Sequence, residues 1–96
     1  MLTIDLIQRT VKPLAEKYNL VKVDLFGSYA NGNATEKSDA DFLLTFHNQP
    51  PSIFKVLGFK QELETLLNNP VDVVTLPLIR QDRLNIEKVI NIYERA

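Results

Sequence analysis

The eight residues from Asp39 to Phe46, written DADFLLTF, constrain the fold more than any other part of this chain. Their alternation predicts a strand, because successive side chains of a strand point to opposite faces. One face carries apolar side chains only, at positions 40, 42, 44 and 46, whereas the other begins with Asp39 and Asp41. A core must therefore cover one face, while the other face brings two like charges to the start of the strand.

Helical and strand patterns alternate along the rest of the chain. A helical apolar spacing follows Thr3, a residue type that caps helices, and Pro13 is expected to kink this helix or split it in two. Strands are expected at residues 21–26 and 71–76, the second covered on both faces because it is almost wholly apolar. A helix capped by Ser52 is expected to carry an apolar stripe formed by Ile53, Phe54, Leu57, Leu63, Leu66 and Leu67. A last helix is expected from about Asp82, with Ile86, Val89, Ile90 and Tyr93 facing inward.

This order of elements predicts an α/β (α+β) fold in which helices cover a small mixed β-sheet. The chain has 96 residues, 45% of them hydrophobic and 24% charged, which suits a single domain, residues 1–96, with one core. We expect neither internal repeats nor linkers.

Composition excludes several classes of function. With 11 basic and 12 acidic residues the net charge is −1, so no general attraction to nucleic acid or to an anionic membrane is expected. The chain has no cysteine and one histidine, which removes thiol catalysis and cysteine- or histidine-rich metal sites. No apolar run approaches the ~20 residues that span a bilayer, and the N-terminus lacks the pattern of a signal peptide. We therefore expect a soluble cytoplasmic protein.

The paired aspartates indicate a site for hard cations. Asp39 and Asp41 share a face a few ångströms apart, and such charges repel unless one is protonated or a cation neutralises both. Paired carboxylates commonly hold Mg²⁺ through oxygen. Asp72, an acid within an apolar strand, is the expected third carboxylate if the two strands are neighbours. Asp24 follows Lys22 closely in an alternating strand and is not expected to contact metal.

Gly27 and Ser28 come directly after the expected strand at residues 21–26. A glycine there lets the backbone approach a ligand that a Cβ would block, and the Ser28 hydroxyl with nearby amides could hold phosphate oxygens. No lysine follows in the position that a Walker loop requires. Each feature alone has an ordinary structural explanation, but their combination favours a phosphate and metal site.

In this chain, Gly27-Ser28 is followed by ten residues and then by Asp39-Ala40-Asp41. This arrangement resembles the signature of the DNA polymerase β-like nucleotidyltransferase superfamily. Within it, nearly the whole chain is similar to the minimal nucleotidyltransferase (MNT) family. The similarity includes the approach from Leu25 to Ala30 and the strand from Val71 to Thr75.

The resemblance implies a reaction on ATP. Asp39 and Asp41 would hold two Mg²⁺ ions, Asp72 would complete one metal site, and Gly27 with Ser28 would bind the phosphates. Many MNT proteins are antitoxins of HEPN-domain toxins, to which they transfer AMP at a tyrosine, so a HEPN toxin is the implied partner. Many relatives have a basic residue at the position of Asn31 and a larger aliphatic one at Ala40.

Three other functions remain open at the level of sequence. The chain could be a binding antitoxin that masks the toxin without catalysis, although three adjacent acids are costly to keep without a metal. A nucleotidyltransferase acting on a small molecule fits the same motif, but no second domain is available to bind that acceptor. A module that binds nucleic acid directly is disfavoured because the charge is balanced and no basic stripe is present.

Overall fold

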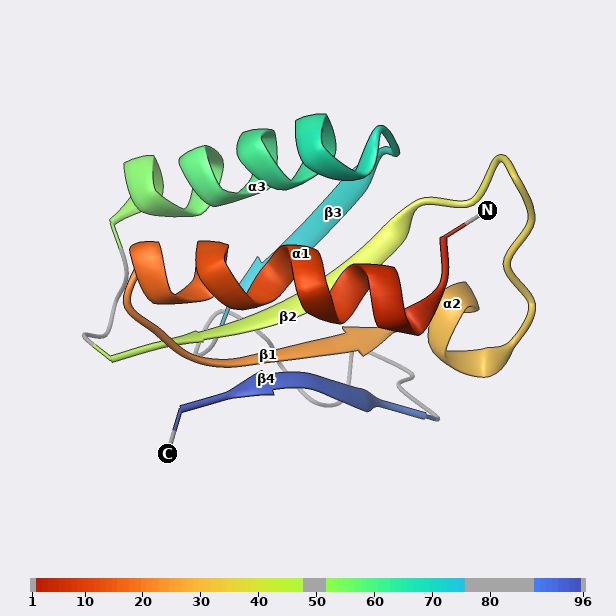
Figure 1. The fold of residues 1–96 in the computed structure, drawn as a ribbon, viewed down its shortest axis with the longest axis horizontal. Helices are drawn as coiled ribbons and strands as arrows, with labels where there is room; N and C mark the ends of the chain where they lie inside the picture. The colour runs from red at the N-terminus through yellow and green to blue at the C-terminus, as the bar shows by residue number, and fades with distance from the viewer. Residues whose placement is uncertain (1, 48–51, 76–87, 96) are drawn as a thin grey trace.

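The computed structural model describes residues 2–47, 52–75 and 88–95 as a mixed sheet with helices on one face (Figure 1). Its elements are α1 (Ile4–Lys17), β1 (Leu20–Phe26), α2 (Ser28–Asn31), β2 (Ala40–Phe46), α3 (Ile53–Leu67), β3 (Val71–Thr75) and β4 (Ile90–Glu94). The strand order is β3-β2-β1-β4. β1 is antiparallel to both β2 and β4, whereas β2 and β3 are parallel. The predicted fold class is therefore confirmed.

The first helix begins where the sequence predicts. The Thr3 hydroxyl accepts a hydrogen bond from the backbone N–H of Leu6 at 3.1 Å, which satisfies one of the free amides of the first turn. Pro13 lies inside the helix but does not split it, since α1 continues to Lys17. Its buried face consists of Ile7, Val11, Leu14 and Ala15.

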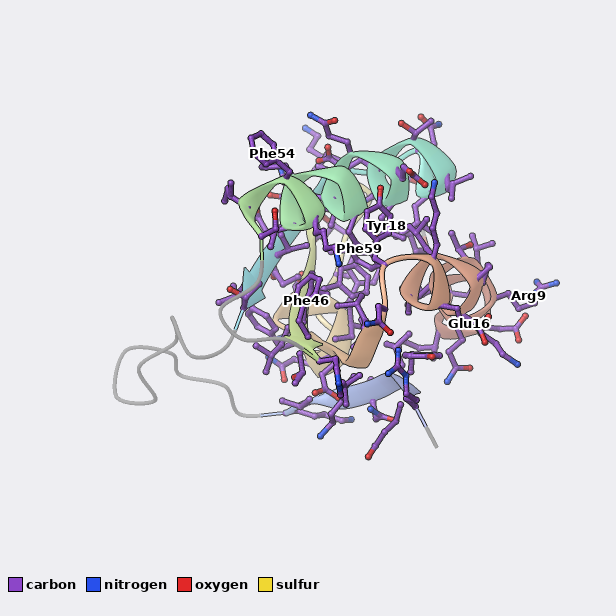
Figure 2. The ribbon with its side chains drawn as sticks, turned by 90° about the vertical axis from the view of Figure 1, so that its left-hand side faces the viewer. Arg9, Glu16, Tyr18, Phe46, Phe54 and Phe59 are labelled. Carbon is purple, nitrogen blue, oxygen red and sulfur yellow. The ribbon has the colours of Figure 1, made fainter. Side chains whose placement is uncertain are left out.

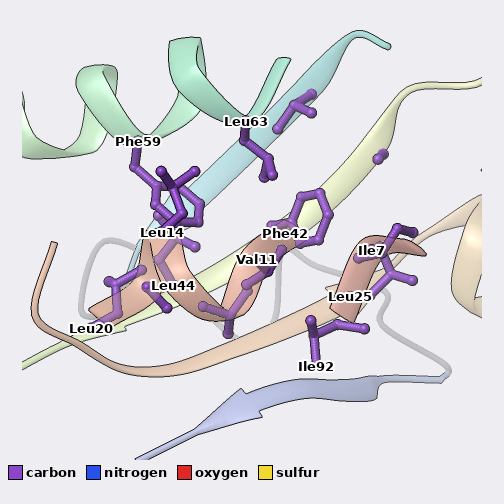
Figure 3. Packing of buried hydrophobic residues seen from close by; sticks show 14 of the residues in the cluster. Ile7, Val11, Leu14, Leu20, Leu25, Phe42, Leu44, Phe59, Leu63 and Ile92 are labelled. Carbon is purple, nitrogen blue, oxygen red and sulfur yellow. The ribbon is translucent and has the colours of Figure 1, made fainter. Parts of the chain in front are cut away.

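The core lies between the sheet and the two long helices (Figure 3). Alternation along β2 buries positions 40, 42, 44 and 46, as predicted, and leaves the intervening side chains on the opposite face. Figure 3 shows Phe59 and Leu63 of α3 pointing toward the sheet, where Phe42 is fully buried. The helices thus cover one face of the sheet, and Asp41 lies on the other.

The predicted apolar stripe of α3 is wrong in part. The buried side chains are Phe59, Leu63 and Leu67, at four-residue intervals. Ile53, Phe54, Leu57 and Leu66 are instead exposed, Phe54 by 81%. Figure 2 shows Phe54 at the outer side of α3, whereas Phe59 points toward the core. Six apolar residues cover more than one side of a helix, and packing against α1 and the sheet selects which side is buried.

The predicted C-terminal helix is also wrong over its described part. Residues 90–94 form β4, which pairs with β1 and places Ile92 in the core, while Val89 is exposed. A segment of alternating Ile, Asn, Ile and Tyr suits a strand as well as a helix turn, and pairing with the free edge of β1 decides between them. The predicted start of that helix near Asp82 lies outside the described residues.

The expectation that both faces of the strand at residue 71 are covered fails at Asp72. Val71 and Thr75 of β3 are buried and Val73 and Val74 are half-buried, whereas Asp72 is exposed. Among the described strands, β3 pairs with β2 only. Elsewhere, none of the helices in the described ranges is long and apolar enough to cross a membrane.

Candidate active site

Two of the predicted acids lie side by side on neighbouring strands. In the parallel register of β2 and β3, Asp41 is the partner of Asp72, and both lie on the face away from the helices. Asp39 precedes β2 by one residue and is exposed. The condition under which Asp72 was expected to approach the paired aspartates, that the two strands are neighbours, is therefore met, and acids 31 positions apart in sequence lie side by side.

The carboxylates repel one another in the folded chain. The pKa of Asp41 is raised above its ordinary value of 3.8, first because the group is partly buried and then because Asp72 and Asp39 are close. None of the three acids forms a hydrogen bond or an ion pair with another described side chain. An uncompensated group of negative charges is costly to the fold, and a cation would relieve it.

The acids do not form a finished metal cage in this chain alone. Among residues 2–47, 52–75 and 88–95, no three histidine or acidic side chains are close enough together to hold an ion. The donor set nevertheless suits Mg²⁺, which binds few protein oxygens and keeps several water or phosphate ligands. The carboxylates of Asp41 and Asp72, which have no cationic side chain paired with them among the described residues, fit such an ion.

The position of the Asp41 carboxylate on the neighbouring strand requires a glycine at residue 27. It follows β1 with φ +74°, a left-handed conformation that favours glycine. A Cβ placed on it would collide with Oδ2 of Asp41 and lie 3.2 Å from its Cγ. The described contact shows that the missing Cβ makes room for the Asp41 carboxylate. That Gly27 also lets the backbone approach a ligand stays a prediction.

Ser28 begins α2, the short turn of helix beside the end of β1 (Figure 1). The backbone N–H of Asn33 donates to the Ser28 carbonyl at 2.9 Å, which closes the turn. Ser28 is half-buried as a residue, and its hydroxyl makes no hydrogen bond to the described residues. Gly27, Ser28 and the Asp41 carboxylate therefore lie at one end of the sheet, with the hydroxyl available to a ligand.

Asp24 differs from the three acids at the strand ends. It is 5% exposed and accepts a hydrogen bond from Nδ2 of Asn91 at 3.0 Å, with Nζ of Lys22 at 3.7 Å. The predicted neighbourhood of Lys22 and Asp24 is confirmed. Asn91 was missed, because the sequence analysis assigned its segment to a helix.

Sequence reasoning also missed two residues at the junction of α3 and β3. Asn69 donates from Nδ2 to the Ser38 carbonyl at 3.2 Å, and Glu64 accepts from the Val71 N–H at 3.0 Å. The sequence marks this segment, Asn68-Asn69-Pro70, only as a break between elements. No pattern in the neighbouring residues indicates that the Asn69 side chain reaches Ser38, the residue before Asp39.

Known proteins resemble this chain in sequence and in structure. The model of the polymerase β nucleotidyltransferase family matches residues 9–95. The protein adenylyltransferase MntA of Thermococcus cleftensis is 37% identical over 78 residues, which cover 77% of this chain and 78% of that protein.

Two solved structures share the fold. A toxin–antitoxin complex with AMP-PNP contains a chain with a TM-score of 0.78 and 20% identity, covering 92% of this chain and 73% of that one. A tri-AMPylated Shewanella oneidensis HEPN toxin in complex with MNT antitoxin contains one with a TM-score of 0.73 and 18% identity, covering 97% and 74%. The family match extends over most of the chain and includes the glycine turn and all three acids, so this chain belongs to the polymerase β nucleotidyltransferase family.

Proposed function

We propose that this chain is a Mg²⁺-dependent nucleotidyltransferase that transfers AMP from ATP to a tyrosine hydroxyl of a HEPN toxin and acts as its antitoxin. The observation that carries the proposal is the Asp41 carboxylate, which is packed against Gly27, lies opposite Asp72 and has no cation partner among the described residues. The named activity of the relative from Thermococcus cleftensis supports protein adenylyl transfer. The two toxin–antitoxin structures support the partner.

Each site residue has a role in this proposal. Asp39 and Asp41 would hold Mg²⁺, and Asp72 would complete one of the two metal positions. When bound, Mg²⁺ supplies positive charge to the triphosphate and to the leaving pyrophosphate. The Gly27 backbone and the Ser28 hydroxyl would bind phosphate oxygens and orient the α-phosphorus.

The transfer is an in-line displacement. The acceptor oxygen forms a bond to the α-phosphorus while the bond from that phosphorus to the bridging oxygen of the β-phosphate breaks, and pyrophosphate leaves with the electron pair. The acceptor hydroxyl loses its proton to the Asp72 carboxylate, which passes it to water. Positioning and charge neutralisation account for most of the rate in such reactions.

A second candidate, neutralisation of the toxin by binding alone, is favoured by the outer side of α3. Ile53 and Phe54 there are exposed by 61% and 81%, and exposed apolar patches are typical of protein interfaces. Under this alternative the complex forms and protects the cell without nucleotide transfer.

The test uses the purified chain, Mg²⁺, ATP labelled at the α-phosphate and a HEPN toxin. We compare wild type with the Asp39→Asn, Asp41→Asn double variant, and use Glu36→Gln, an exposed acid of the same loop, as the matched control. Label on the toxin with wild type and Glu36→Gln, but not with the double variant, supports the enzyme. Absence of label while wild type still forms a stable complex supports binding alone and refutes the proposed transfer.

A further inference from the structure

Asn69 joins the two segments that carry the outer acids of the site. Its Nδ2 donates to the Ser38 carbonyl at 3.2 Å and to the Pro70 carbonyl at 2.9 Å. Ser38 immediately precedes Asp39, and Pro70 lies two residues before Asp72. One side-chain amide therefore connects the backbone at both acids.

The neighbouring hydrogen bonds hold the same edge. The N–H of Ala40 donates to the Pro70 carbonyl at 3.0 Å, which starts the pairing of β2 with β3. Glu64, in the last turn of α3, accepts the N–H of Val71 at 3.0 Å and ties the first residue of β3 to the helix. β3 is thus hydrogen-bonded to α3 at its first residue. The position of Asp39 then depends on how the preceding segment, residues 35–38, is held.

That segment, residues 35–38, has few other restraints among the described residues besides the Ala40–Pro70 bond on the far side of Asp39. The side-chain bonds of Thr35 and Ser38 stay within it, such as the Thr35 N–H to Ser38 Oγ at 2.8 Å. Asp39 is exposed and carries charge of the same sign as Asp41 and Asp72, whose repulsion favours moving it outward. A restraint just before Asp39 therefore opposes the electrostatic force between the acids.

We propose that Asn69 is a positioning residue, whose amide holds the segment of Asp39 against that of Asp72 and thereby sets the affinity of the site for divalent cations. The inference rests on the proposed function, since it concerns the same three acids. Residues that orient metal ligands typically contribute about 10- to 100-fold in metal affinity. The described hydrogen bonds of the Asn69 amide go to backbone carbonyls, so its proposed effect is exerted through the backbone of the two acidic segments.

The test removes the donor and measures cation binding directly. Asn69→Ala removes the amide, Asn69→Leu replaces it with an apolar group of nearly the same shape, and Asn69→Gln retains an amide donor. Asn68→Gly is the matched control, because Asn68 is exposed, has φ +51° and ends α3 in a conformation that suits glycine. The probe is Mn²⁺, titrated with a nonhydrolysable ATP analogue and followed by electron paramagnetic resonance, alongside thermal melting of each variant.

We expect Asn69→Ala and Asn69→Leu to bind Mn²⁺ about tenfold more weakly than wild type, with Asn68→Gly unchanged and Asn69→Gln partly restored. In the transfer assay, the Mg²⁺ concentration for half-maximal rate should rise by a similar factor, and saturating Mg²⁺ should return most of the maximal rate. If the alanine variant does not fold, the leucine variant provides the same comparison.

Two results overturn the inference. The first is that Asn69→Ala and Asn69→Leu bind Mn²⁺ with the affinity of wild type. The second is a loss of rate that saturating Mg²⁺ does not restore and that follows the melting temperature, which indicates a purely structural role. Wild type that binds no Mn²⁺ in the presence of the analogue refutes the proposed function itself, and this inference with it.

Discussion

Two acids on the same face of the sheet, Asp24 and Asp41, are in opposite situations. Asp24 is nearly fully buried on β1, but Asn91 and Lys22 lie against its carboxylate and compensate its charge. Asp41 is less buried on β2, and its pKa is raised, first by its partial burial and then by the charges of its neighbours Asp72 and Asp39. The two side chains differ in the partners that the fold provides, although their chemistry is the same.

The difference separates a structural acid, Asp24, from the acid that we propose binds a cation, Asp41. Burial of a carboxylate is tolerated when hydrogen bonds and an opposite charge replace its water, as at Asp24. At Asp41 the fold removes part of the water and adds like charges, which costs stability. Such an arrangement is retained in sites that a cation or substrate completes.

The largest expected effect is that of Asp41→Asn on transfer. We expect a loss of about a thousandfold, because the variant lacks the charge that would hold Mg²⁺ at the reacting phosphate. Labelled AMP on the toxin measures it. If the variant keeps its activity, Asp41 is not needed for transfer, and its role does not differ from that of Asp24.

The same variant has a signed effect on stability. Because folding raises the pKa of Asp41, its ionised form destabilises the wild type at neutral pH, and Asn should melt at the same or a higher temperature. As the pH falls through the raised pKa and below 3.8, Asp41 becomes protonated and the difference should vanish. A lower melting temperature for Asp41→Asn at neutral pH contradicts this account.

The next largest effect is that of Gly27→Ala. Its Cβ collides with the Asp41 carboxylate, so the acid must move, and we expect transfer to fall by about tenfold to a hundredfold. Gly32→Ala is the matched control, since Gly32 has φ +78° and nothing within 4 Å of its added Cβ. Backbone strain costs Gly32→Ala, in the αL region, about 1–2 kcal/mol in urea unfolding. Gly27→Ala should lose somewhat more stability, about 1–3 kcal/mol, because φ +74° with ψ −150° is a conformation that is essentially restricted to glycine. Equal losses of transfer in the two variants would refute the role of the collision.

A smaller effect, on stability only, is expected for Asp24→Ala. The change leaves the Asn91 amide and the Lys22 ammonium without their partner, which should lower the free energy of unfolding by about 1–3 kcal/mol. Urea denaturation measures this loss, and Mn²⁺ binding at the site should stay as in wild type. If Asp24→Ala instead weakens Mn²⁺ binding and leaves stability unchanged, Asp24 contributes to the metal site and not to the fold.

The smallest effect is expected for Glu62→Gln on the surface. Glu62 accepts hydrogen bonds from Lys17 at 2.7 Å and from Tyr18 at 2.8 Å. These bonds, that from Lys17 first, lower the pKa of Glu62, whereas the pKa of Asp41 is raised. Their stabilisation is present above the ordinary Glu value of 4.5 and is lost as the pH falls through the lowered pKa. The variant should therefore melt slightly below wild type at neutral pH, and the gap should close in acid. A gap that widens in acid would show the sign to be wrong.

Much of the fold could be predicted because periodicity is a local property. The alternation of β2 and the cap at Thr3 follow from residues that are close in sequence. The outer side of α3 could not be predicted, since its apolar residues cover more than one side and only packing chooses among them. β4 could not be predicted either, because five residues suit two structures until β1 offers an edge.

The site divides in the same way. The sequence by itself determined that the alternation from Ala40 to Phe46 turns Asp41 away from the core and that a glycine follows β1, because chain geometry sets both over a few residues. Only the tertiary structure decided that Asp72 lies beside Asp41, that Gly27 must lack a Cβ, and that Asn69 joins the two acidic segments. These contacts link residues 14 to 31 positions apart, and their formation depends on which strands pair and not on any local preference.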